Sequence, residues 1–196
     1  ACGLTIVMIT GGIDISVGSV TALVCMVLAD LMENKGVNAY AAVLVALLIG
    51  VAFGIVQGFL VAYLDIQPFI VSLAGMFFAR GMTTIVNTNP FNVANEQFVA
   101  LKDTRITIPG MGSVNKLGNY VNAYIEIGVV VALLVVILLF CVLRFTKFGR
   151  KFYAVGGNSQ SALMLGINVK RTKFFAYLIC SVLAGIGGFV YFMHVG

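Results

Sequence analysis

The sequence has few charged residues and few of the residue types that build reactive sites. Only 10% of its 196 residues are charged, and it contains no tryptophan, one histidine and three prolines. Soluble domains carry charge on roughly 25% of their residues, so a soluble enzyme of the Rossmann type, a coiled coil and a disordered chain are all excluded. The lone His194 and four widely separated cysteines provide no metal-ligand set, and we predict no cofactor.

Apolar residues dominate the composition of the chain. They make up 61% of the chain, and the mean hydropathy is +1.07. The length allows about five or six membrane spans of about 20 residues each. We therefore predict an all-α, polytopic transmembrane helical bundle, organised as a single domain over 1–196. The cysteines are expected to be small buried apolar side chains, and an aromatic belt would depend on tyrosines such as Tyr63 and Tyr177.

Both ends of the sequence are apolar. It begins ACGLTIVMI and finishes AGIGGFVYFMHVG. Membrane proteins usually carry polar ends outside the bilayer, so we expect an internal piece of a longer protein, with further helices on both sides.

Residues 1–29 are apolar except for a short polar stretch, TGGIDIS, at 10–16. One straight helix over this segment would be about 43 Å long, which exceeds the bilayer core of about 30 Å. Two glycines followed by Asp14 and Ser16 predict the end of one helix and the start of another. Irregular backbone at this depth must be surrounded by protein or line a water-filled cavity.

Four further apolar segments predict spans. They are residues 39–64, 69–86, 126–144 and 174–193. In the first of them Gly50, Gly54 and Gly58 recur every four residues, a spacing that favours close helix packing; the alternative is the wall of a transport pathway.

Positive charge sets the orientation. Seven of the 12 Lys and Arg residues, and no acid, lie in 144–173. Because basic loops stay in the cytoplasm, we predict a cytoplasmic loop at 144–173 and an extracytoplasmic loop at 87–124. The protein is then a multi-pass protein of the cell inner (plasma) membrane, and its positive charge faces membrane lipid with no nucleic acid as partner.

The basic loop contains a helix signal of its own. Asn158 or Ser159 can cap a helix, Gln160–Leu165 is long enough for about two turns, and Gly166 can end it. Its residues, Ala162 among them, give it an apolar surface. By physics alone two interpretations remain open: docking into a groove of a cytoplasmic protein, or lying at the lipid headgroup boundary.

Three motifs follow one another in a recognisable order: TGGIDISVGSV (10–20), VAYLDIQPFIVSLAGMFFARG (61–81) and FGRKFYAVGGNSQSALMLGINVKRTKFFAY (148–177). Together they resemble the inner-membrane permeases of ribose-type monosaccharide ABC importers, over essentially the whole chain. The outer loop 87–124 departs from the ribose pattern and is similar to the longer loop of the galactofuranose-type branch.

The resemblance implies a set of partners. Two permease subunits, identical or different, form the pore; a cytoplasmic ATP-binding subunit drives it; and a periplasmic or lipid-anchored sugar-binding protein delivers the cargo. The chain itself is then no enzyme, in keeping with its lack of a Walker A motif. The resemblance also favours docking of the loop 144–173 onto the ATPase. The coupling residues that it implies, with Ala162 added from the short helix, are Gly149, Arg150, Tyr153, Ala154, Gly156, Gly157, Asn158, Ala162 and Gly166.

Four polar residues within apolar segments are candidates for the translocation pathway: Asp14, Ser16, Gln57 and Arg80. Ionisable groups inside a membrane are functional candidates by default, yet each has a structural alternative. Asp14 and Ser16 can cap a helix, and Gln57 can bond to a neighbouring helix. Arg80 can pair with an acid such as Asp14, or snorkel outward.

The motifs favour the permease subunit of an ATP-driven monosaccharide importer over two alternatives. An ion-coupled secondary transporter would need several intramembrane acids, and Asp14 is the only acid well inside an apolar stretch. A membrane-embedded enzyme would need paired Asp, Glu or His on facing helices.

Overall fold

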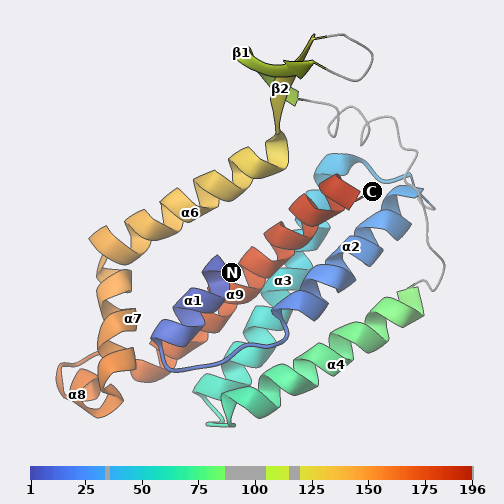
Figure 1. Ribbon diagram of the computed structural model, residues 1–196. Helices are drawn as coiled ribbons and strands as arrows, with labels where there is room; N and C mark the ends of the chain where they lie inside the picture. The colour runs from blue at the N-terminus through green and yellow to red at the C-terminus, as the bar shows by residue number, and fades with distance from the viewer. Residues whose placement is uncertain (34–35, 87–104, 115–119, 196) are drawn as a thin grey trace.

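The computed structural model describes residues 1–33, 36–86, 105–114 and 120–195, and it is a helical bundle (Figure 1). Its helices are α1 (Cys2–Ile9), α2 (Val17–Glu33), α3 (Ala39–Ala62), α4 (Pro68–Val86), α6 (Ile127–Phe145), α7 (Lys147–Gly157), α8 (Ser159–Met164) and α9 (Val169–Val195). The predicted all-α bundle is confirmed. One antiparallel hairpin, β1 (Arg105–Val114) and β2 (Tyr120–Glu126), lies in the predicted outer loop 87–124; the rest of that loop lies outside the described residues.

Four of the described helices are long and apolar enough to cross a membrane: α3, α4, α6 and α9. The protein is therefore a multi-pass membrane protein. The turn between α3 and α4 lies at the same end of the bundle as α7 and α8, and the hairpin lies at the opposite end (Figure 1). This arrangement agrees with the predicted orientation, in which the loops 87–124 and 144–173 lie on opposite sides of the membrane.

Helix α9 is the centre of the bundle. It packs against α1, α2 and α3, and it also contacts α6, α7 and α8. Its most extensive contact is with α3, where the glycine stripe lies directly on the α9 backbone. A Cβ atom at Gly54 would lie 2.8 Å from the Cα atom of Leu178, and one at Gly50 would lie 2.7 Å from the carbonyl oxygen of Ser181. The glycines therefore serve helix packing, the favoured of the two interpretations.

The first apolar segment is a broken helix, as predicted, but its two pieces run in opposite directions. Helix α1 runs toward α7, and the chain then turns back before α2 leads to the other end (Figure 1). Both Gly3 in α1 and Asp14 within the break approach Cys180 of α9, which places them at the same depth. Gly11 permits the reversal because its φ of +79° is open to glycine.

Two predictions about side chains are wrong. Cys141 is exposed on α6, so not all of the cysteines are buried within the protein. Tyr177 is only 1% exposed and belongs to the core, because α9 turns this face toward α1 and the break that follows it. Tyr63, at the end of α3, is 41% exposed and remains available at the membrane boundary.

Replacing Gly54 by Ala should destabilise the bundle. The added methyl group meets the backbone of α9, and such overpacking costs typically about 1–3 kcal/mol. Gly18→Ala is the matched control, since a Cβ atom at Gly18 meets nothing within 4 Å and alanine favours a helix. Thermal unfolding in detergent should show a lowered midpoint for the first variant and an unchanged or raised midpoint for the second. Equal midpoints would contradict the close α3–α9 contact.

Candidate functional site

A buried polar cluster lies where α2 begins. The hydroxyl of Ser16 donates to Oδ1 of Asp14 at 2.6 Å, and the side-chain amide of Gln57 donates to the Ser16 oxygen at 2.8 Å. All three residues are at most 3% exposed. The structure thus brings together three of the four predicted pathway residues, from the break and from α3.

Helix α9 completes this cluster. The Tyr177 hydroxyl donates to the carbonyl oxygen of Ile13 at 3.2 Å, and the Cys180 thiol donates to Oδ2 of Asp14 at 3.4 Å. Sequence reasoning missed both residues, because a single Tyr or Cys in an apolar helix gives no signal of what it faces. Their contacts pack one side of the irregular backbone of 10–16 against protein, the side on which Gly12, Asp14 and Ser16 are buried, whereas Gly11, Ile13 and Ile15 are exposed.

Asp14 fixes the entry into α2. Its Oδ1 atom accepts from the backbone N–H of Ser16 at 3.0 Å, and the Ser16 carbonyl oxygen accepts the first helical bond, from Val20, at 2.9 Å. An Asp side chain that bonds two residues ahead in this way forms an Asx turn. These contacts give Asp14 a structural role at the break, and they satisfy polar backbone groups that lipid could not.

Arg80 does not join the cluster. It is exposed on α4, and no ion pair links it to Asp14, whose described partners are Ser16 and Cys180. A guanidinium on an exposed face of a membrane helix can snorkel toward the headgroups.

An apolar cleft adjoins the cluster between α3 and α4. Its volume is about 350 Å³, and its lining includes Phe53, Phe78 and Gly75. Gln57 is the one polar side chain among the described residues that line it. The side-chain nitrogen of Gln57 lies against Gly75, where a Cβ atom would collide with it. Gln57 therefore connects the buried cluster with the cleft.

A second candidate site is the α7–α8 unit in the loop 144–173. The corner between α6 and α7 is tight: Thr146 caps α7 by accepting from the N–H of Gly149 at 3.3 Å. A side chain at Gly149 would collide with the carbonyl group of Leu143. From this corner α7 turns Phe152 and Val155 inward, where they are 0% and 3% exposed.

Asn158 separates the two helices of this unit. Its Oδ1 atom accepts from the N–H groups of Gln160 and Ser161 at 2.9 and 3.0 Å, so Asn158, rather than Ser159, caps α8. Gly166 ends the unit with a φ of +76°. The predicted short helix is confirmed, with both boundaries one residue earlier than the predicted Gln160–Leu165, at Ser159 and Met164.

The glycine pair has a different role from the predicted sharp turn. Gly156 and Gly157 form the last turn of α7, a helix that the sequence did not predict, and the chain turns at Asn158. A Cβ atom at Gly156 would collide with the carbonyl oxygen of Ile9 at the end of α1, whereas one at Gly157 meets nothing within 4 Å. Glycine at position 156 therefore lets α7 approach α1.

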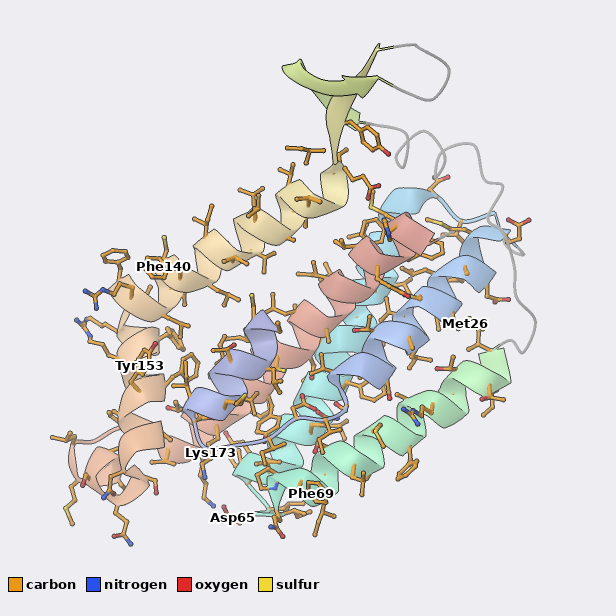
Figure 2. The ribbon with its side chains drawn as sticks, viewed as in Figure 1. Met26, Asp65, Phe69, Phe140, Tyr153 and Lys173 are labelled. Atoms are coloured by element: carbon orange, nitrogen blue, oxygen red, sulfur yellow. The ribbon has the colours of Figure 1, made fainter. Side chains whose placement is uncertain are left out.

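Of the other predicted coupling residues, some are part of the packing of the α7–α8 unit and others are exposed on its surface. Ala162 is 1% exposed, and the carbonyl oxygen of Ala154 accepts from the N–H of Asn158 at 3.2 Å. Arg150 and Tyr153 are exposed on α7, and Figure 2 shows Tyr153 on the side of α7 away from α2 and α4. Of the nine predicted coupling residues, six lie in α7, Asn158 lies between α7 and α8, Ala162 lies in α8 and Gly166 follows it.

Comparison with known proteins decides the family. The family described as "Branched-chain amino acid transport system / permease component" matches residues 1–196. The chain belongs to this permease family. The resemblance predicted from the three motifs is thereby confirmed.

Curated relatives of this permease chain share about a third of its residues. The fructose import permease protein FruG of Bifidobacterium longum is 36% identical over 100% of the chain and 56% of the relative. The inner membrane ABC transporter permease protein YjfF of Escherichia coli is 34% identical, over 99% and 55%. The ribose import permease protein RbsC of Escherichia coli is 35% identical, over 97% and 56%.

The permease chain spans about half the length of the curated relatives that it matches. No solved structure matches it. The names of these relatives describe transport permeases and not enzymes, and one of them names the inner membrane. They agree with the multi-pass helices of the structure.

Ser16→Ala should destabilise the permease by about 1–3 kcal/mol, because it leaves the buried amide of Gln57 without its acceptor and removes a donor from Asp14. Ser181→Ala is a matched control: this serine is 1% exposed, and its hydroxyl has no hydrogen-bond partner among the described residues. Its removal should be neutral or stabilising. Denaturant unfolding in detergent measures both, and equal effects would show that the Ser16 contacts contribute nothing.

Proposed function

We propose that the protein is the membrane-spanning subunit of an ATP-driven importer of a monosaccharide-type solute. It forms half of a translocation pathway with a second permease subunit. A cytoplasmic ATPase drives the cycle, and a binding protein outside the inner membrane delivers the cargo. The names of the relatives support the cargo class, since two of them are a fructose and a ribose import permease protein.

The main support for an ATPase partner is the exposed C-terminal end of α8, which we call the tip of the α7–α8 unit. Its three consecutive apolar residues, Leu163, Met164 and Leu165, are 65%, 88% and 77% exposed. Such a patch on a short, firmly capped helix is costly in water and suits a groove on another protein. It lies on the predicted cytoplasmic side, where ATP is available.

Few elements separate the tip of α8 from the polar cluster, so movement of the tip could reach the cluster through them. Helix α8 follows α7 directly, α7 contacts the end of α1 at Gly156 and Ile9, and the chain leads from there through 10–16 to Asp14. The first and last steps are connections along the chain, and the middle step is a close approach of two backbones at Gly156 and Ile9. We infer that ATP-driven movement of α8 shifts the break and with it the cleft at Gln57.

We expect the hydrogen bonds of the buried polar cluster to stabilise the resting conformation of the permease. Asp14 and Ser16 are buried and hydrogen-bonded to one another and to α3 and α9. They become available to cargo only when the break moves. Gln57 is the residue that can reach cargo first, because it lines the cleft. Arg80, which is exposed on α4, has no role in this proposed route.

Met164→Asp should abolish docking while leaving the protein in the membrane. In the proposed complex Met164 would be buried against the ATPase. Replacing an apolar residue at the centre of an interface by a charged one typically weakens the binding free energy by at least about 2 kcal/mol, or about 30-fold in affinity. Gln67→Asp is the matched control, because it adds the same charge at an exposed position at the same end of the bundle. Co-purification with the ATPase and ATP-driven sugar uptake in proteoliposomes should fail for the first variant only. Normal uptake by Met164→Asp would refute the proposed coupling.

Gly156→Ala should impair coupling even though docking is intact. The added methyl group forces α7 away from α1, at a cost of about 1–3 kcal/mol, and less movement then reaches the break. Gly157→Ala adds the same methyl group in open space and should behave as the unaltered protein. The measurement is the number of sugar molecules imported per ATP hydrolysed. If both variants keep the normal ratio, the route through α1 is wrong.

A further inference from the structure

We propose that the outer face of α7 binds the phosphate headgroups of anionic phospholipids in the cytoplasmic leaflet. Lys147, Arg150 and Lys151 are exposed and follow the spacing i, i+3, i+4, which places them on one face of this helix. Gly149 and Phe152, three residues apart, are buried on a different face of the helix. Helix α7 therefore has a face packed against the bundle and a cationic face turned away from it.

The cationic face needs an anionic partner. Like charges at i, i+3 and i, i+4 destabilise a helix by mutual repulsion. Among the described residues no carboxylate lies within ion-pair distance of these three cations, and the one described Lys–carboxylate pair at this end joins Lys170 to Asp65 at 3.6 Å. The protein thus gathers three positive charges without neutralising them within its described part.

The depth of this face matches the headgroups. Helix α6 leads into it with side chains that face away from protein, such as Phe140 at 62% exposure, and Figure 2 shows Phe140 on the outer side of the bundle. The first cation follows the end of α6 by two residues, and the three cations span about 6 Å along α7. Phe145 and Phe148, 73% and 50% exposed, add apolar side chains next to the cations, a combination that suits the boundary between headgroups and acyl chains.

A lipid fits this face better than the ATPase does. Residues 152–169 contain no charged residue, so the apolar tip of α8 is separated from the cations by a neutral stretch. Helix α7, which carries the cations, directly follows the spanning helix α6, and α8 lies at the far end of α7 (Figure 1). Juxtamembrane basic residues are attracted to anionic lipids over short distances. The two surfaces therefore suit two different partners, and the lipid site does not depend on the cargo or on the ATPase.

The test is lipid retention by the purified protein in nanodiscs that mix phosphatidylcholine and phosphatidylglycerol, measured by native mass spectrometry. The triple variant K147Q/R150Q/K151Q should bind phosphatidylglycerol at least about tenfold more weakly, given the contribution of each juxtamembrane cation. The control K170Q/R171Q/K173Q removes the same charge at the same end and should retain phosphatidylglycerol. Circular dichroism should show equal helical content in both, since repulsion in α7 is relieved; if the triple variant does not fold, K147Q/K151Q takes its place.

Three results would overturn the proposal. Unchanged retention by the α7 variant would show that the face binds no lipid. Equal losses in the two triple variants would show a diffuse effect of net charge rather than a site on α7. Displacement of phosphatidylglycerol by inorganic phosphate would assign the face to a soluble anion. The assay contains neither ATP nor sugar, so its failure would leave the proposed import function unaffected.

Discussion

Direct contact between the backbones of α3 and α9 is the constraint on which the other features depend. Between transmembrane helices there is little hydrophobic driving force, so association relies on close packing and on interhelical hydrogen bonds. Gly50, Gly54 and Gly58 bring α3 onto α9. This approach carries Gln57, one residue before Gly58, into reach of Ser16. A bulkier stripe would separate the helices and leave the polar groups of the break without partners.

The break between α1 and α2 has a cost that the surrounding helices offset. Irregular backbone at membrane depth would leave N–H and C=O groups unsatisfied, each at several kcal/mol. Here Asp14 bonds to the backbone of Ser16, and Tyr177 bonds to that of Ile13. The first bond lies within the break and the second comes from α9, so the break is held both by its own turn and by a neighbouring helix. This combination suits a transport cycle that alternates between two arrangements.

Helix α7 joins three environments in eleven residues. Its inner face and Gly156 meet the bundle, its outer face carries cations, and its C-terminal end leads into the exposed apolar tip of α8. In the proposed import cycle, a helix held by lipid headgroups on one side and by α1 on another would transmit movement of α8 to the break. Binding of lipid headgroups would strengthen that fixation and make the transfer of movement to the break more efficient.

Composition and motif spacing determined the family of this protein, the positions of the spans and the capped helix α8, and they predict its membrane orientation. Those features depend on local chemistry: hydropathy sets a span, positive charge sets a side, and Asn158 and Gly166 set the limits of α8. The reversal after α1, the helix α7, the parts of Tyr177 and Cys180, and the separation of Arg80 from Asp14 were decided only by the tertiary structure. Each of these depends on which residues far apart in the chain meet, and a single apolar helix carries little information about which of its faces will pack and against what.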